Sequence, residues 1–287
     1  MVDASSNRNW TNKVNVHKNK ILDKIFNFFI KKIGSQSVDT LTSISGITLL
    51  IFKIFRDILR PPFYFSNFIN QTYSIGVKSF LLAAITGLAT GSVMALQFGH
   101  GLAKFGGTLY IPKVVSLSIL REMGPVFTSL LIAGRVGSGI ASEIASMNVT
   151  QQIDAMRALG TNPIKVIVIP RVLACMVTLP LLTLFADYIG IFGAMIVSNY
   201  ELHISSEYFI AKATEAIRIV DLLTGMAKSL FFAFFISIIA CWKGLNTTGG
   251  TKGIGNTTTW VVVTSCIFIL ISDYFLSKVF IFTVYQK

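Results

Sequence analysis

Charged side chains are scarce in this chain of 287 residues, because Asp, Glu, Lys and Arg together make up only 13% of it. A soluble domain carries about a quarter. Hydrophobic residues make up 53%, and long stretches hold one ionisable group or none. Such stretches suit the hydrocarbon core of a bilayer, which is about 30 Å thick. The composition excludes a soluble domain and predicts an all-α integral membrane protein with several crossings.

Cysteine is also rare, and the chain lacks the signatures of catalytic and metal sites. The three cysteines, Cys175, Cys241 and Cys266, each fall in an apolar stretch, and no C-x-x-C pair occurs. There is no G-x-S-x-G motif and no H-E-x-x-H motif. We therefore expect no metal, no disulfide and no enzymatic activity in this chain.

A glycine-rich segment, Gly244–Gly255 (GLNTTGGTKGIG), comes nearest to a phosphate-binding loop. A P-loop requires Gly-Lys followed by Ser or Thr, between a strand and a helix. Here Gly253 follows Lys252, and apolar stretches flank the segment. We interpret it as a flexible cytoplasmic connection, and we expect no cofactor and no ATP site in this chain.

Basic residues exceed acidic ones by 12, and half of the excess lies in the first sixty residues. Beside amphipathic stretches, such charge favours anionic lipid headgroups over nucleic acid. We expect a disordered basic tail over 1–17 and amphipathic interfacial (elbow) helices over 18–60. In Lys18–Ile33 the lysines lie largely off the apolar face, and the stretch 38–59 ends at Pro61-Pro62, which forces a turn. A true crossing by 38–59 is the alternative.

Five apolar stretches in the region 61–287 are each long enough for a crossing helix, which needs about 20 residues. They cover roughly 73–98, 114–141, 164–198, 221–242 and 257–282. The third is long enough to be tilted or broken, at Pro170 or Pro180. Counts of Lys and Arg place the N-terminus in the cytoplasm, with 16 on that side and 6 on the other. Five crossings then put the C-terminus outside.

Small residues recur every four positions in three of these spans, a pattern that lets helices approach closely in lipid. The three ridges are Ala83–Ala95, Ala133–Ala145 and Ala186–Ser198. We interpret them as packing surfaces within the chain, with room for one of them to serve a dimer interface.

The segment Arg121–Gly160 is the most informative part of the sequence. It leaves the membrane at about Arg135–Glu143 and then predicts a short amphipathic cytoplasmic helix over 143–160. A short helix held between two spans suits docking into a groove on a partner protein. A helix that only rests on the bilayer surface is the alternative.

The same segment resembles the MlaE/YrbE permeases, the membrane subunits of ABC-type lipid transporters that are associated with MCE proteins. The motifs that carry the resemblance are Arg121–Val126 (REMGPV), Ala133–Ile144 (AGRVGSGIASEI) and Met147–Ala155 (MNVTQQIDA). With shorter matches elsewhere, the resemblance covers roughly 58–282. One departure is Gln151, which stands where the family usually has Glu.

The resemblance implies a homodimeric permease of the inner membrane. Its partners would be cytoplasmic P-loop ATPase subunits, which bind ATP and Mg²⁺, and MCE-domain proteins on the periplasmic side. The implied substrate is phospholipid, moved between the inner membrane and the outer envelope. Coupling to the ATPase is then expected in the 143–160 helix, through Glu143, Met147, Gln151, Gln152, Asp154 and Met156.

Two other classes of function stay open. A secondary transporter driven by an ion gradient is one, although such proteins often show inverted repeats and no repeat relates the two halves of this sequence. A scaffold that assembles the ATPase with the MCE ring, without transporting anything, is the other. Loss of transport with assembly intact would separate a permease from a scaffold.

Four of the charged residues inside the predicted spans are the candidate lipid site, since each costs about 2.5–3.5 kcal/mol at mid-membrane. They are Arg121, Glu122, Lys228 and Asp273. At 1.5 Å per residue, Arg121 and Lys228 lie about 11 Å and Asp273 about 13 Å below the same outer surface. Arg121 and Glu122 point about 100° apart. We predict that one of them pairs with Lys228 or Asp273 while the rest receive the lipid headgroup. A purely structural ion-pair cluster is the alternative.

Overall fold

The computed structural model of the chain describes residues 41–61 and 63–285. The tail expected over 1–17 and the helix expected over Lys18–Ile33 lie outside these residues. The chain divides into two compact units, with the boundary between residues 49 and 50. The larger unit, Leu50–Lys287, carries the elements discussed below. In the smaller unit the structure describes residues 41–49, which are helical.

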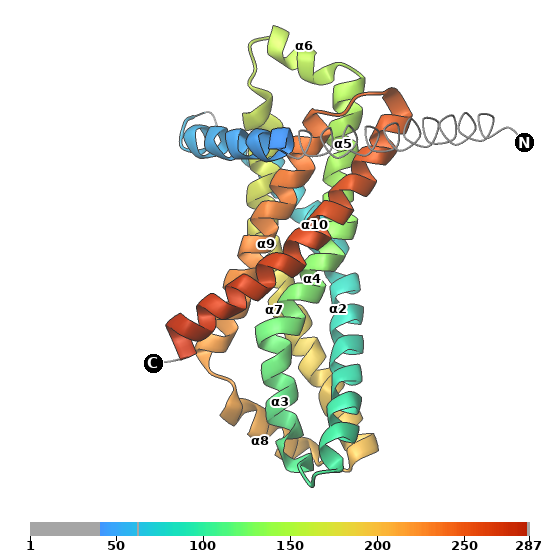
Figure 1. Ribbon diagram of the computed structural model, residues 1–287. Helices are drawn as coiled ribbons and strands as arrows, with labels where there is room; N and C mark the ends of the chain where they lie inside the picture. Colours follow the sequence, from blue (N-terminus) through green and yellow to red (C-terminus); the bar gives the residue numbers. More distant parts are fainter. Residues whose placement is uncertain (1–40, 62, 286–287) are drawn as a thin grey trace, which may run out of the picture. The chain divides into compact units, whose positions relative to one another are not determined.

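All regular structure in the described residues is helical, and five helical stretches are long and apolar enough to cross a membrane (Figure 1). They are Phe65–Ala103, Thr108–Val149, Ile164–Leu202, Ile219–Leu245 and Gly250–Thr283. The predicted all-α class and the number of spans are confirmed. Each stretch is longer than predicted, because the helix continues past the most apolar residues into polar ones.

The component helices keep the labels of Figure 1. The first two spans are α2 (Phe65–Ala103) and the run η1 (Thr108–Tyr110), α3 (Ile111–Ser118), η2 (Ile119–Met123), α4 (Gly124–Ile132), η3 (Ala133–Gly137) and α5 (Ser138–Val149). After α6 (Gln152–Ala158) come η4 (Ile164–Val168), α7 (Ile169–Leu202), α8 (Ser206–Ala216), α9 (Ile219–Leu245), α10 (Gly250–Phe280) and η5 (Ile281–Tyr285). Of the five η segments, η1 is a 3₁₀-helix and the rest are π-helices.

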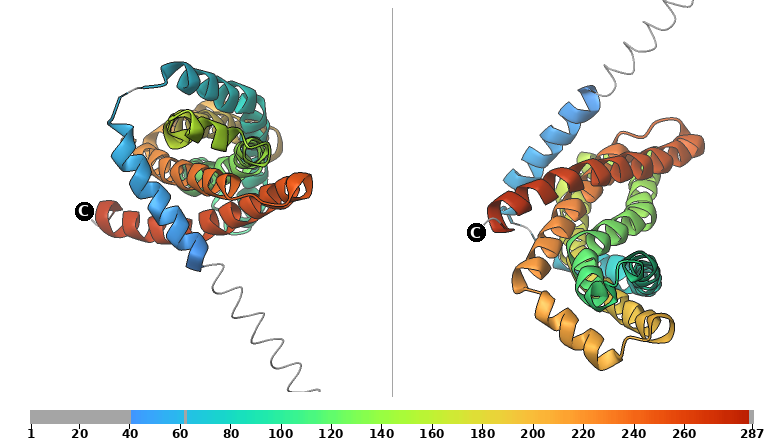
Figure 2. Two further views of the ribbon diagram at one scale, coloured as in Figure 1. Left: turned by 90° about the horizontal axis from the view of Figure 1, so that it is seen from above. Right: turned by 60° about the horizontal axis from the view of Figure 1, so that its bottom comes forward.

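The spans alternate in direction, so α6 lies at one end of the bundle and α8 at the other (Figure 1). We call these the α6 end and the α8 end. Figure 2 shows α10 crossing the neighbouring spans obliquely. Successive spans therefore bring residues far apart in sequence to the same level.

Two prolines inside the spans each leave a carbonyl without its usual helical donor, and a side chain from another helix supplies one. Pro125 has no N–H for the carbonyl of Arg121, to which Lys228 Nζ donates at 3.0 Å. Pro170 has none for the carbonyl of Val166, to which Asn67 Nδ2 donates at 3.3 Å. The break predicted at Pro180 is absent, since α7 continues through it.

The ridges of small residues in α2 and α7 pack against each other. A Cβ added to Gly87 would overlap the carbonyl oxygen of Ala186, and one added to Gly91 would overlap that of Gly190. Only glycine allows this approach, as expected for close helix pairs in lipid. These two ridges therefore serve packing within the chain.

The predicted helix over 143–160 is instead two helices. The second span continues through α5 to Val149, and Gln151 then adopts a left-handed conformation with φ of 59° before α6 begins at Gln152. A left-handed residue ends the helical path and redirects the chain. Glu143 and Met147 consequently belong to the end of the second span, whereas Gln152, Asp154 and Met156 belong to α6.

The glycine-rich segment is also more ordered than predicted. The helix α9 ends at Leu245 and α10 begins at Gly250, so most of the segment 244–255 is helical. Gly249 and Gly250 supply the positive φ angles of 93° and 64° that the turn requires. The two threonine hydroxyls of Thr247 and Thr257 then close the turn with a hydrogen bond of 2.9 Å.

The stretch 38–59 is helical over its described residues 41–58, and it is not among the five candidate spans. Its end is tied to the start of the third span. Asn162 Nδ2 donates to Asp57 at 3.0 Å, and Lys165 Nζ donates to the carbonyls of Arg60 and Pro61 at 3.3 and 3.2 Å. The position of this helix in the interface stays a prediction.

Candidate functional site

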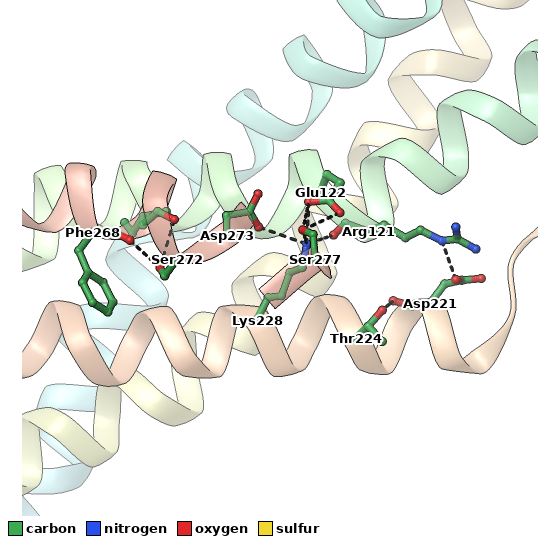
Figure 3. A network of polar contacts seen from close by, with 10 residues as sticks. Arg121, Glu122, Asp221, Thr224, Lys228, Phe268, Ser272, Asp273 and Ser277 are labelled. Carbon is green, nitrogen blue, oxygen red and sulfur yellow. Dashed lines mark hydrogen bonds and ion pairs between the residues drawn. The ribbon is translucent and has the colours of Figure 1, made fainter. Parts of the chain in front are cut away.

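Lys228 on α9 is the centre of a polar cluster inside the bundle, and its side chain is only 2% exposed. Its ammonium donates at 2.6 Å to Glu122 Oε2, at 2.7 Å to Ser277 Oγ and at 3.0 Å to the carbonyl of Arg121. It also forms an ion pair of 3.2 Å with Asp273 Oδ1. Figure 3 shows the ammonium between residues of the second, fourth and fifth spans. These contacts satisfy all three donors of the buried ammonium without water.

The two carboxylates that face Lys228 are more accessible than the lysine itself. Glu122 is 37% and Asp273 is 20% exposed. Ser277, one helical turn after Asp273, donates to the Glu122 carboxylate at 3.0 Å and accepts from Lys228 (Figure 3). Lys228 and Ser277 thus hold two carboxylates whose outer edges are open to a ligand.

Arg121 points to a different partner. Its Nε donates at 2.7 Å to Asp221 Oδ1, and Asp221 is fully buried near the start of α9. The other oxygen of Asp221 accepts from the backbone N–H of Arg218 at 3.0 Å, which closes a capping box. The Arg121 side chain remains 35% exposed. Its pair with Asp221 lies beside the Lys228 group, and the Arg121 carbonyl joins the two.

The structure brings Glu122, Lys228 and Asp273 into direct contact and turns the side chain of Arg121 to Asp221. The π-helix η2 contains both Arg121 and Glu122, so the two neighbours leave the helix on different sides. Asp221 and Ser277 were not predicted. Their sequence signals were present, since Asp221 lies two helical turns before Lys228 and Ser277 lies one turn after Asp273.

Counting formal charges, this cluster holds two cations and three carboxylates. The cations are Arg121 and Lys228, and the carboxylates are Glu122, Asp221 and Asp273. Each buried member is paired with partly exposed members of opposite charge: Asp221 with Arg121, and Lys228 with Glu122 and Asp273. The partly exposed groups are therefore one guanidinium and two carboxylates. The surface of the cluster therefore presents both signs of charge within an apolar bundle.

The six residues predicted to contact an ATPase fall into two groups at the α6 end. Gln151, Gln152 and Asp154 are exposed at or beside α6, with Met156 half-buried and Ile153 anchored in the interior. Asp154 pairs with Arg157 at 2.9 Å, and both are exposed. On α5, Met147 is half-buried, and Glu143 pairs with Arg171 of α7 at 3.0 Å. Gln151, Gln152 and Asp154 are therefore accessible to solvent at this end.

Comparison with known proteins identifies relatives along most of the chain. Residues 68–279 match the family of the permease MlaE. A probable ABC transporter permease protein of Rickettsia felis is 40% identical over 248 residues, which are 86% of this chain and 96% of that one. A probable ABC transporter permease protein of Synechocystis is 40% identical over 78% of this chain and 86% of that one. The chloroplastic protein trigalactosyldiacylglycerol 1 of Arabidopsis thaliana is 35% identical over 82% of this chain and 67% of that one.

Proposed function

The chain belongs to the MlaE permease family, and from that premise we propose that it moves phospholipid between the inner membrane and the outer envelope. Its relatives make it a permease subunit of an ABC transporter. One relative carries a diacylglycerol lipid in its name, which supports a lipid as the substrate class.

The observation that carries the proposal is the charged cluster around Lys228. Its exposed groups are a guanidinium on Arg121 and carboxylates on Glu122 and Asp273, and apolar helices surround them. A ligand that matches both features is an amphiphile whose headgroup carries a phosphate for Arg121 and an amine for the carboxylates. A zwitterionic phospholipid is such a ligand.

ATP would be hydrolysed by a separate subunit, docked at α6. The exposed residues Gln152 and Asp154 form the contact surface in this proposal, with Gln151 at the turn. The second span links this surface to the lipid site, because Thr108–Val149 is one continuous helical stretch that contains Glu122. From Val149 to Glu122 the helix axis covers about 40 Å. The pair of Glu143 with Arg171 would pass the same movement to α7.

The assembly that fits this proposal is a homodimer, with MCE-domain proteins at the α8 end. The α6 end would face the cytoplasm, in agreement with the Lys and Arg counts. With an odd number of spans, the C-terminus would then lie in the periplasm. Accessibility of single cysteines at Gln152 and at Lys278 to a membrane-impermeant reagent tests this orientation in intact cells.

The function is tested by reconstituting the full complex in vesicles and following ATP-dependent transfer of a fluorescent phospholipid. We expect Glu122→Gln to reduce transfer at least tenfold while the dimer and its bound ATPase stay intact. Glu207→Gln, the same change at an exposed position of α8, should leave transfer unchanged. Transfer that continues with an inactive ATPase and stops when ion gradients are dissipated would identify a secondary transporter. A complex that assembles and hydrolyses ATP without moving lipid would be a scaffold.

A further inference from the structure

A second polar pocket lies between α2 and the second span, nearer the α6 end than the Lys228 cluster. Its volume is about 200 Å³. Gln71, Ser74 and Lys78 of α2 line one side, and Arg135, Gly139 and Glu143 line the other. None of these residues touches the Lys228 cluster, so the pocket is a separate site.

Two cations at this pocket have no carboxylate partner among the described residues. Lys78 is exposed, and Arg135 Nη1 donates to the buried hydroxyl of Ser79, whose own O–H donates to the Ile75 carbonyl at 2.5 Å. Glu143 is engaged by Arg171 at 3.0 Å. Two cations that line one pocket without a carboxylate partner favour an anionic ligand, which can accept charge-assisted hydrogen bonds from both.

The depth of the pocket matches the phosphates of one leaflet. Arg135 follows Arg121 by fourteen residues, or about 21 Å along the helix. With Arg121 about 11 Å below the surface at the α8 end, Arg135 lies about 32 Å below it. The hydrocarbon core is about 30 Å thick, so Arg135 lies at the opposite headgroup layer. In the headgroup layer, most phosphate groups belong to lipids.

The pocket has open space at Gly139. A Cβ added to this glycine would meet no atom within 4 Å. Arg135 and Glu143 lie one turn before and one turn after it on the same face of the helix. A group the size of a phosphate can therefore approach the helix backbone between the two side chains.

We propose that this pocket binds the phosphate of an anionic phospholipid in the leaflet at the α6 end. The inference rests on the proposed lipid transport and adds a second lipid site with a different preference. The Lys228 cluster presents both signs of charge, whereas Lys78 and Arg135 favour a headgroup with net negative charge. Free inorganic phosphate shares the chemistry and is the alternative source to be separated by experiment.

The test uses the full-length permease in nanodiscs of phosphatidylcholine that contain a small fraction of photoactivatable phosphatidylglycerol. Crosslinks to α2 around Lys78 and to η3 and the start of α5 around Arg135 are counted by mass spectrometry. We expect the double variant Lys78→Gln with Arg135→Gln to lose about tenfold or more of this labelling, because two charge-assisted contacts are removed. Lys104→Gln, the same change at the other end of α2, should not alter it. Equal labelling in the double variant would overturn the proposal.

A steric pair of variants tests the pocket without changing any charge. Gly139→Leu fills the open space and should abolish the labelling. Gly134→Leu also meets open space but lies outside the pocket lining, and it should keep the labelling. If both variants label like the natural chain, the phosphate does not occupy this pocket.

Two further arms separate the sources of phosphate and the two proposals. Inorganic phosphate at millimolar concentration should not compete with the lipid probe, and full competition would assign the pocket to free phosphate. A photoactivatable phosphatidylcholine should label this pocket less than phosphatidylglycerol, and equal labelling would remove the charge preference. If the pocket is labelled in a complex that moves no lipid, the proposed lipid transport is refuted while the proposed site stands. Transport without any labelling would refute the site alone.

Discussion

The two charged regions of the second span differ in how their charges are compensated. In the Lys228 cluster the two buried charges, Lys228 and Asp221, each face an opposite charge of the same chain. Around Lys78 and Arg135, twenty or so ångströms away along the helix, the cations have hydroxyls and amides near them but no described carboxylate partner. The first region can be stable without a ligand. The second becomes compensated only when an anion arrives.

The largest expected effect follows from breaking the Lys228 cluster, in which the charges are paired within the chain. Lys228→Ala removes the cation between Glu122 and Asp273 and leaves two carboxylates facing each other within the bundle. Loss of one member of a buried ion cluster costs about 3–5 kcal/mol. We expect a large drop in thermal stability in detergent together with loss of lipid transfer. Lys278→Ala, an exposed position of the same span as Asp273, should change neither.

A neutral replacement of the whole group decides between a structural and a lipid-binding role. Combining Lys228→Met with Glu122→Gln and Asp273→Asn removes all three charges, and such replacements are often neutral for stability. We expect thermal stability to return to near that of the natural chain while transfer stays lost. If transfer returns with stability, the cluster is purely structural and the headgroup binds elsewhere.

A glycine-to-alanine substitution in each of the two regions compares how tightly they are packed. A methyl group on Gly124, two residues after Glu122, would overlap the carboxylate of the buried Asp187. Gly124→Ala should therefore cost about 1–3 kcal/mol, as overpacking does. Gly139→Ala at the open pocket meets no atom and should gain up to about 1 kcal/mol from helix propensity. Melting of both variants in detergent measures the difference, and equal shifts would contradict the contrast in packing.

Hydropathy alone was sufficient for the number of spans, because a bilayer imposes a length on every crossing helix. It also placed Arg121, Lys228 and Asp273 at one level, and the contacts around Lys228 agree with that estimate. Asp221 was missed because it stands at the predicted edge of a span, where a charge needs no partner. Ser277 was missed because a hydroxyl carries no comparable penalty in a membrane.

The errors at the α6 end have local causes. The break before α6 depends on Gln151 in a left-handed conformation, and a glutamine gives no signal of that kind, unlike glycine. The segment 244–255 was expected to be flexible because of its glycines. Gly249 and Gly250 make the turn, and Gly253 packs closely against the Thr248 carbonyl inside α10. Glycine in this segment provides close packing of the backbone as well as conformational freedom. The sequence alone does not distinguish these two uses.

An exposed ion pair at α6 provides the opposite extreme from the Lys228 cluster. Asp154 and Arg157 are 2.9 Å apart with both side chains exposed. Asp154→Lys should change stability by less than about 0.5 kcal/mol, since surface pairs contribute little. It should nevertheless weaken co-purification of the ATPase or uncouple hydrolysis from transfer. Glu207→Lys at the α8 end reverses a charge in the same way and should do neither. Normal coupling in Asp154→Lys would mean that α6 only rests on the membrane.

The smallest effect is expected where charges are compensated at the surface of the protein. Glu215 on α8 accepts at 2.7 Å from Lys212 and at 2.9 Å from Lys113 of α3, so it joins the two helices. Hydrogen bonds from Lys212 and then Lys113 lower the pKa of Glu215 from 4.5 to about 2. A lowered pKa means that the pair stabilises the folded chain above pH 4.5 and that this contribution is lost as the pH falls towards 2.

Amide exchange of α8, corrected for its intrinsic pH dependence, should rise across that range. In Glu215→Gln the exchange should already be raised and should not change further with pH, and high salt should bring the natural chain close to the variant. Identical pH profiles in both would show that the contact between α3 and α8 depends on Phe209 and the apolar residues around it, and that compensation in water adds nothing there.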